Sequence, residues 1–168
     1  MNKIIIYHSI FFLISITLSY CTFEVVVYSD IRNFLVTLQV LSAAVFTLAG
    51  IWVAYIYPEA IAVFTNPKDV SLLKGSERTE RVEELVLTIL VSAFVLLSTI
   101  LIFLSEAIFK NTNFVQNNAN DFMFLIVTST VMLTTIQSKA MLTIMVNNIK
   151  FVNELYNKKI ERQANDDL

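Results

Sequence analysis

The sequence of 168 residues contains few of the residues that interrupt or cross-link regular structure, with two glycines, two prolines and one cysteine. A single cysteine excludes an intrachain disulfide framework and a cysteine-based zinc site. Charged residues are also scarce, at 15% of the chain against about 25% in an ordinary soluble domain. The 12 basic and 14 acidic residues leave no excess of positive charge, so we expect no nucleic-acid partner.

Hydrophobic residues, by contrast, make up 56% of the chain, above the roughly 45–50% of soluble domains. They gather in four uncharged segments, each close to the about 20 residues that cross about 30 Å of hydrocarbon. These segments are residues 4–22, 34–57, 85–104 and 122–138. The sequence therefore predicts an all-α integral membrane protein, a single membrane domain with four transmembrane helices in contact with lipid.

The placement of Lys and Arg predicts how the four helices are oriented. All but two of the 12 basic residues lie in the N-terminal tail, in the loop 58–84 and in the C-terminal part 139–168. The other two lie in the loops 23–33 and 105–121. Because cytoplasmic loops carry the excess of basic residues, we expect both termini in the cytoplasm of a bacterium and the chain in its inner membrane.

The first hydrophobic segment has a second interpretation. A basic residue, Lys3, followed by an apolar stretch is also typical of a secretory signal peptide, which is removed from the mature protein. Ser19, Tyr20 and Cys21 form a poor cleavage site, because small residues are needed there, so we expect a retained helix. Cleavage would leave three helices and separate the two termini across the membrane.

The fourth helix is predicted to continue past Lys139, since no glycine or proline follows Asn120 to break it. Apolar residues recur there at alternating spacings of three and four, the pattern of a helix–helix seam. This α-helical seam consists of Leu142, Met145, Ile149, Val152 and Tyr156. It can join copies of the chain into a homo-oligomer, or it can pack against a helix of the loop 58–84 in the same chain.

Small and uncharged polar residues form faces on the predicted spans. The face on the second span is Gln39, Ala43, Thr47, Gly50 and Ala54, and the face on the fourth is Thr130, Thr134 and Gln137. On the third span Thr88, Ser92 and Thr99 are approximately aligned. Such residues hold helices together within or between subunits, or they line a polar pore built by several copies. We favour the contact role, and the scarcity of glycine disfavours a carbonyl filter.

Side chains that could act in proton transport, catalysis or metal binding are few in the predicted spans. We expect no charge near the centre of a span, with Lys139 at the cytoplasmic end of the fourth, and this disfavours a proton-coupled transporter. His8 is the only histidine, and no catalytic or metal-binding motif surrounds it. The sequence therefore predicts no enzyme activity, no cofactor and no metal site.

The basic residues of the loop 58–84 include three candidates for contact with a soluble cytoplasmic protein. These are Lys74, Arg78 and Arg81, on a helix that we expect to begin after Ser76 and to run into the third span. The alternative is a solvated helix end on which Arg81 forms surface ion pairs with Glu77 and Glu84.

The four spans, the loop 58–84 and the basic C-terminal helix through Arg162 resemble small four-helix membrane subunits of bacterial phage-defence systems, such as the membrane component of Kiwa. The resemblance is one of architecture over the whole chain, with no shared motif. It implies an oligomer in the inner membrane that senses or responds to infection and engages a cytoplasmic partner. We therefore expect an oligomeric membrane scaffold or sensor, with a homo-oligomeric pore or a small transporter subunit as alternatives.

Overall fold

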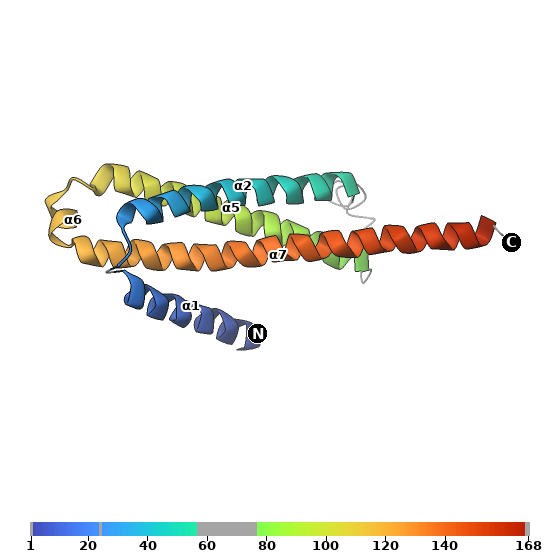
Figure 1. Cartoon of the computed structure of the whole chain (residues 1–168), viewed down its shortest axis with the longest axis horizontal. Helices are drawn as coiled ribbons and strands as arrows, with labels where there is room; N and C mark the ends of the chain where they lie inside the picture. Colours follow the sequence, from blue (N-terminus) through green and yellow to red (C-terminus); the bar gives the residue numbers. More distant parts are fainter. Residues whose placement is uncertain (1, 24, 57–76, 167–168) are drawn as a thin grey trace, which may run out of the picture. The chain divides into compact units, whose positions relative to one another are not determined.

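The computed structural model describes residues 2–23, 25–56 and 77–166, and 94% of these residues are helical with no strand among them (Figure 1). The helices are α1 (Asn2–Thr22), α2 (Tyr28–Ile56), α5 (Glu77–Phe109), α6 (Asn113–Asn117) and α7 (Ala119–Asp166). The all-α prediction is thus confirmed. Three helices, α2, α5 and α7, are long and apolar enough to cross a membrane.

Each predicted span lies within one helix, apart from Tyr57, which lies outside the described residues, and the helices are longer than the predicted spans. α5 begins at Glu77, and α7 runs for 48 residues without a break, so the prediction that the fourth helix continues past Lys139 is confirmed. α1 has 21 residues, although its apolar stretch among the described side chains, Phe12–Thr22, is shorter than a membrane span. The loop residues 57–76, with Lys74 and Ser76, lie outside the described part of the chain.

The predicted loop 105–121 is largely helical. α5 extends to Phe109, and the short helix α6 follows after only three residues. Thr112 caps α6, because its Oγ1 accepts a hydrogen bond from the backbone N–H of Val115 at 3.4 Å. The connection between α5 and α7 is therefore a compact turn of helix rather than an extended loop.

The contacts within the chain group into two compact units, Met1–Ala44 with Val91–Ser138, and Val45–Leu90 with Lys139–Leu168. Each unit contains one segment of α2, one of α5 and one of α7. In the first unit the three segments meet at a core of Leu38, Val95 and Leu133, one residue from each helix. Each long helix therefore contributes to both units.

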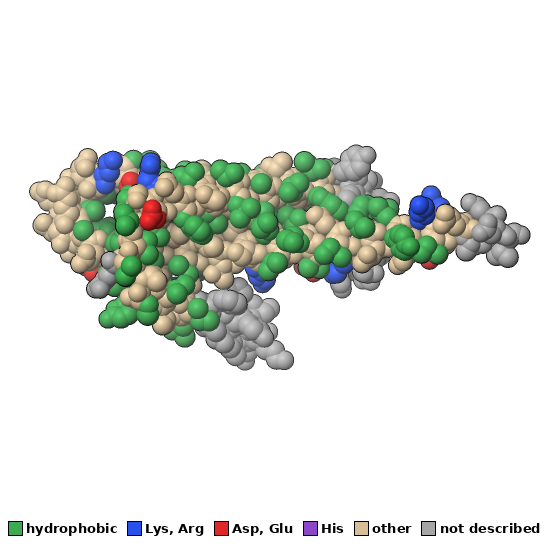
Figure 2. All heavy atoms as spheres, viewed as in Figure 1, with side chains coloured by type: hydrophobic (Ala, Val, Ile, Leu, Met, Phe, Trp, Pro, Cys, Tyr) green, Lys and Arg blue, Asp and Glu red, His purple; other side chains and the backbone are tan. Residues whose placement is uncertain are grey.

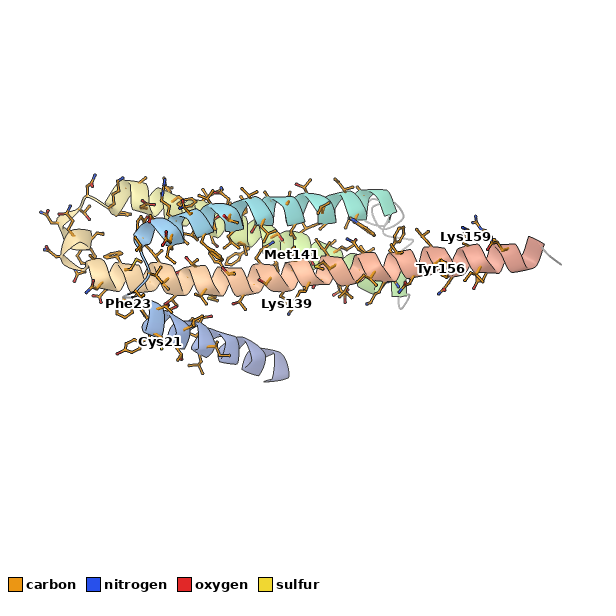
Figure 3. All side chains as sticks on the ribbon, viewed as in Figure 1. Cys21, Phe23, Lys139, Met141, Tyr156 and Lys159 are labelled. Atoms are coloured by element: carbon orange, nitrogen blue, oxygen red, sulfur yellow. The ribbon has the colours of Figure 1, made fainter. Side chains whose placement is uncertain are left out.

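Contacts at one end of the first unit join α1 and α2 to the other helices. The rings of Phe23 and Phe124 meet edge to face at 5.8 Å, which places the end of α1 beside the start of α7. Arg32 of α2 pairs with Glu106 of α5 at 3.8 Å. Figure 3 labels Cys21 and Phe23 at this end of α1. Charged and aromatic side chains thus close this end of the unit.

The second unit ends in the same kinds of contact. Trp52 of α2 meets Phe151 of α7 edge to face, with ring centroids 5.1 Å apart. Arg81 of α5 pairs with Glu154 of α7. These two contacts bring α2 and α5 to the same stretch of α7.

Buried residues recur mostly at alternating spacings of three and four along each long helix. On α2 they are Leu35, Leu38, Ser42, Val45 and Ala49, and on α5 they are Arg81, Leu85, Thr88, Ser92, Val95 and Thr99. On α7 they are Val127, Thr130, Leu133, Gln137, Ala140, Ile144 and Asn147. Residues at these spacings share one face of a helix, so each helix packs through a narrow stripe. The predicted alignment of Thr88, Ser92 and Thr99 is confirmed.

Large hydrophobic side chains also cover the outside of the helices, as the green surface in Figure 2 shows. On α5, for example, Leu97 and Leu101 are each 60% exposed. Soluble monomers seldom expose large contiguous apolar patches, because water is a poor solvent for them. Apolar side chains facing outward are typical of helices that are surrounded by lipid, in agreement with the membrane prediction.

We expect α7 to remain one helix on both sides of Lys139 in solution. Met141 and Lys159 are exposed and are labelled in Figure 3. Nitroxide labels at these two positions should give a narrow distance distribution near about 27 Å, from a rise of about 1.5 Å per residue. The distance is measured by pulsed electron–electron double resonance on a protein with Cys21→Ser, so that only the two chosen positions carry labels. The labelled protein is diluted with unlabelled protein. A broad distribution centred well below that distance would mean that the helix breaks.

Candidate functional site

Gln137 is a polar side chain enclosed between two helices. It is fully buried in the first unit, and its Nε2 donates a hydrogen bond to Oγ of Ser92 on α5 at 3.4 Å. Its Oε1 has no hydrogen-bond partner. An unsatisfied buried acceptor lowers the stability of the fold by about 1–3 kcal/mol. The unpaired Oε1 therefore offsets the stability that the hydrogen bond of Nε2 contributes. The contact also places Ser92 level with Gln137 and so fixes the register of α5 against α7.

The two other α7 candidates satisfy their hydroxyl groups within their own helix. Thr130 is buried and donates to the backbone carbonyl of Ile126 at 2.8 Å. Thr134 is half-buried and donates to the carbonyl of Thr130 at 2.7 Å. Thr130 and Gln137 therefore lie inside the first unit, in the packed stripe of α7, where they can act as contacts between the helices of the chain.

The predicted face on α2 differs from the face that packs within the chain. The packed stripe includes Ser42, which is fully buried and donates to the carbonyl of Leu38 at 2.8 Å. In the predicted face Gln39, Ala43 and Gly50 are half-buried, whereas Thr47 and Ala54 are exposed. A Cβ atom added at Gly50 would meet nothing within 4 Å, so the space beside it is open. This face borders the outward surface of α2.

α7 has two opposite faces in the second unit. Its packed face carries Ala140, Ile144 and Asn147, which are at most 5% exposed. At about 100° of rotation per residue, the predicted seam lies on the other side of the helix. The seam residues are exposed by 60% (Leu142), 50% (Met145), 60% (Ile149), 61% (Val152) and 64% (Tyr156). The described part of the chain thus leaves the seam uncovered.

Arg81 is placed differently from the docking residue that the sequence predicts. It is only 6% exposed, because it faces α7 and pairs there with Glu154, whose side chain is 43% exposed. A buried guanidinium needs a carboxylate beside it, since an uncompensated charge in such surroundings is costly. Arg81 therefore serves the contact between α5 and α7. Arg78 belongs to α5, but its side chain lies outside the described residues, as does Lys74.

Lys139 lies two residues, about 3 Å along the helix, beyond Gln137 on α7. The next charged residue on the helix is Lys150. The placement of Lys139 at the cytoplasmic end of the fourth span stays a prediction. Its side chain is exposed and points outward from α7 (Figure 3).

The remaining groups give no sign of a catalytic or metal centre among the described residues. No three His, Cys, Asp or Glu side chains within that part of the chain are grouped so that they could hold a metal ion. Cys21 is exposed and forms no disulfide. Comparison with known proteins gives no matching family model, no matching curated protein and no matching solved structure.

Two features of the site escaped the sequence interpretation. The pairing of Arg81 with Glu154 joins residues far apart in the sequence, and no local pattern indicates it. The other is the packed face of α2, which contains Ser42 and has the same spacing as the predicted face with Ala43.

We expect the contact between Gln137 and Ser92 to behave as a coupled pair. Ser92→Ala leaves the buried Gln137 amide without its acceptor and should lower the free energy of unfolding by about 0.5–1.5 kcal/mol. Adding Gln137→Met should recover most of this loss, because both polar groups are then gone. Ser138→Ala, at an exposed position on the same helix, is the matched control. The free energy of unfolding is measured with denaturant on the detergent-solubilised protein. If the losses of the two single variants simply add in the double variant, the pairing is contradicted.

Proposed function

We propose that this chain is a subunit of a homo-oligomeric scaffold or sensor in a bacterial inner membrane, and that it engages a soluble protein on the cytoplasmic side. The observation that carries the proposal is the uncovered apolar seam of α7, from Leu142 to Tyr156, opposite the face that packs within the chain. The architectural resemblance to phage-defence membrane subunits supports a role in the response to infection.

The proposed topology has four spans with both termini in the cytoplasm. α2, α5 and α7 have the required length and hydropathy. The 21 residues of α1 correspond to about 31 Å of helix, which matches the hydrocarbon thickness of about 30 Å. The excess of Lys and Arg in the N-terminal tail, the loop 58–84 and the C-terminal part supports the orientation.

The seam continues beyond the end of the proposed bilayer. The contact of Trp52 with Phe151 supports a membrane boundary at this level, because tryptophan prefers the interface between hydrocarbon and water. Val152 and Tyr156 lie on α7 beyond Phe151, and they are 61% and 64% exposed. Burial of one large apolar side chain contributes about 1.5–3 kcal/mol, so exposure of this surface to water is unfavourable.

A second copy of the chain is a suitable cover for the seam. Copies anchored in one membrane with the same orientation present parallel α7 helices in register, so equivalent seam residues meet each other. The alternating spacing of three and four is the one that parallel helices need for continuous side-chain packing. The exposed Lys159 and Arg162, near the end of the same helix, are the charged surface that we propose for the soluble partner.

The alternatives fit the geometry less well. A pore lined by Thr130 and Gln137 is disfavoured because both side chains lie inside the subunit, although the outward face of α2 with Thr47 and Ala54 leaves another surface for one. A transporter subunit is less well supported, because such proteins usually carry a charge inside a membrane segment, whereas Lys139 is predicted at the end of its span. The exposed seam supports the scaffold more directly.

The proposal is tested by the mass of the purified protein in detergent and by one pair of variants. Val152→Glu places a charge in the seam, and we expect it to convert a discrete homo-oligomer into monomers in light scattering with refractive-index correction. Asn157→Glu adds the same charge at an exposed position off the seam and should leave the mass unchanged. A monomeric unmodified protein, or equal masses for both variants, would overturn the proposal.

A further inference from the structure

The short helix α6 is tied closely to the ends of two proposed spans. It comprises Asn113–Asn117, follows the end of α5 after three residues and is separated from α7 by one. Four steps of fully extended chain, from Phe109 to Asn113, cover at most about 14 Å. The connection is tighter than that, because the backbone N–H of Thr112 donates to the carbonyl of Phe109 at 2.9 Å. α6 therefore stays near the end of α5.

A ring contact also holds α6 against the start of α7. The rings of Phe114 and Phe122 meet edge to face, with centroids 5.8 Å apart. The same end of α5 carries Glu106, which pairs with Arg32, and the residue after the helix is Lys110. In a membrane, charged side chains avoid hydrocarbon, so we expect this end of α5 at the boundary with water. α6 is then held at that boundary from both sides.

Exposed apolar side chains continue from the outward surface of α5 onto α6. Leu101, Leu104 and Ile108 are 60%, 53% and 58% exposed, and their spacings of three and four place them on one face of α5. Phe114 of α6 is 69% exposed in spite of its contact with Phe122. The apolar surface that is typical of a lipid-facing helix therefore does not end with α5.

α6 combines this aromatic side chain with polar ones. Asn113, Gln116 and Asn117 carry amides and are exposed. At about 100° of rotation per residue, Gln116 lies about 200° from Phe114, on the opposite side of the helix. Amides bind water and headgroups through hydrogen bonds, whereas an aromatic ring is more stable in the apolar part of the interface. Such a division is typical of a segment that lies on a bilayer surface.

We propose that α6 lies on the bilayer surface opposite the cytoplasm, with the ring of Phe114 inserted between the lipid headgroups and the first carbons of their acyl chains. Lipid is the occupant because the exposed apolar side chains of α6 continue those of the proposed span α5. The proposal rests on the spans α5 and α7, and it goes beyond the scaffold function, which uses the cytoplasmic side. α6 thereby ties the turn between these two helices to the outer leaflet.

The test places a single tryptophan on α6 and measures its contact with lipid. Trp52 is the only tryptophan of the chain, so Trp52→Phe provides the background. In vesicles of phosphatidylcholine and phosphatidylglycerol, Phe114→Trp should emit at a shorter wavelength than Gln116→Trp, the matched control on the other side of the helix. Lipids brominated near the headgroup should quench most of the emission of Phe114→Trp and little of that of Gln116→Trp. Dissolved acrylamide should show the opposite preference.

A third variant separates this contact from the spans themselves. Leu101→Trp, on the outward face of α5, should be quenched by lipids that are brominated deeper in their acyl chains. Quenching of Leu101→Trp without any of Phe114→Trp would overturn the surface contact alone, whereas loss of both would overturn the spans as well. A Phe114→Trp emission that neither brominated lipids nor acrylamide quench would mean that protein covers this site, and would also overturn the proposal.

Discussion

The packing of three long helices through narrow stripes, in which small and polar side chains alternate with branched apolar ones, is the constraint on which the rest of the structure depends. In lipid, apolar helices gain no hydrophobic stabilisation from each other, so close packing and a few hydrogen bonds must hold them together. Ser42, Ser92 and Ala49 are fully buried in these stripes beside Leu85 and Val95. Many other large side chains, such as Leu97, face outward.

The stripes set the register, and the register sets the position of every charge. Arg32 meets Glu106 near one end of α5, and Arg81 meets Glu154 near the other. At the two ends oppositely charged groups compensate each other beside water or headgroups. Lys139 is exposed on α7 between two buried residues, Gln137 and Ala140, so its charge lies outside the packed stripe.

The fold was more predictable from the sequence than the candidate site. Uncharged segments and the scarcity of glycine and proline predicted long helices and the unbroken α7, and Ser76 as an N-cap predicted the start of α5 near Glu77. Two features of the site were not predicted. The faces that contain Ser42 and Ala43 on α2 both show spacings of three and four, and only contact with α5 and α7 decides which one packs. The pairing of Arg81 with Glu154 joins residues far apart in the sequence, which no local pattern encodes.

The central claim, that a second copy of the chain covers the seam of α7, is tested most directly by disulfide cross-linking of Val152→Cys in a Cys21→Ser background. The measurement is the fraction of covalent dimer that forms in vesicles under mild oxidation, compared with Asn157→Cys at an exposed position off the seam. The account predicts a high dimer fraction for residue 152 and a low one for residue 157. Equal fractions at the two positions would contradict it.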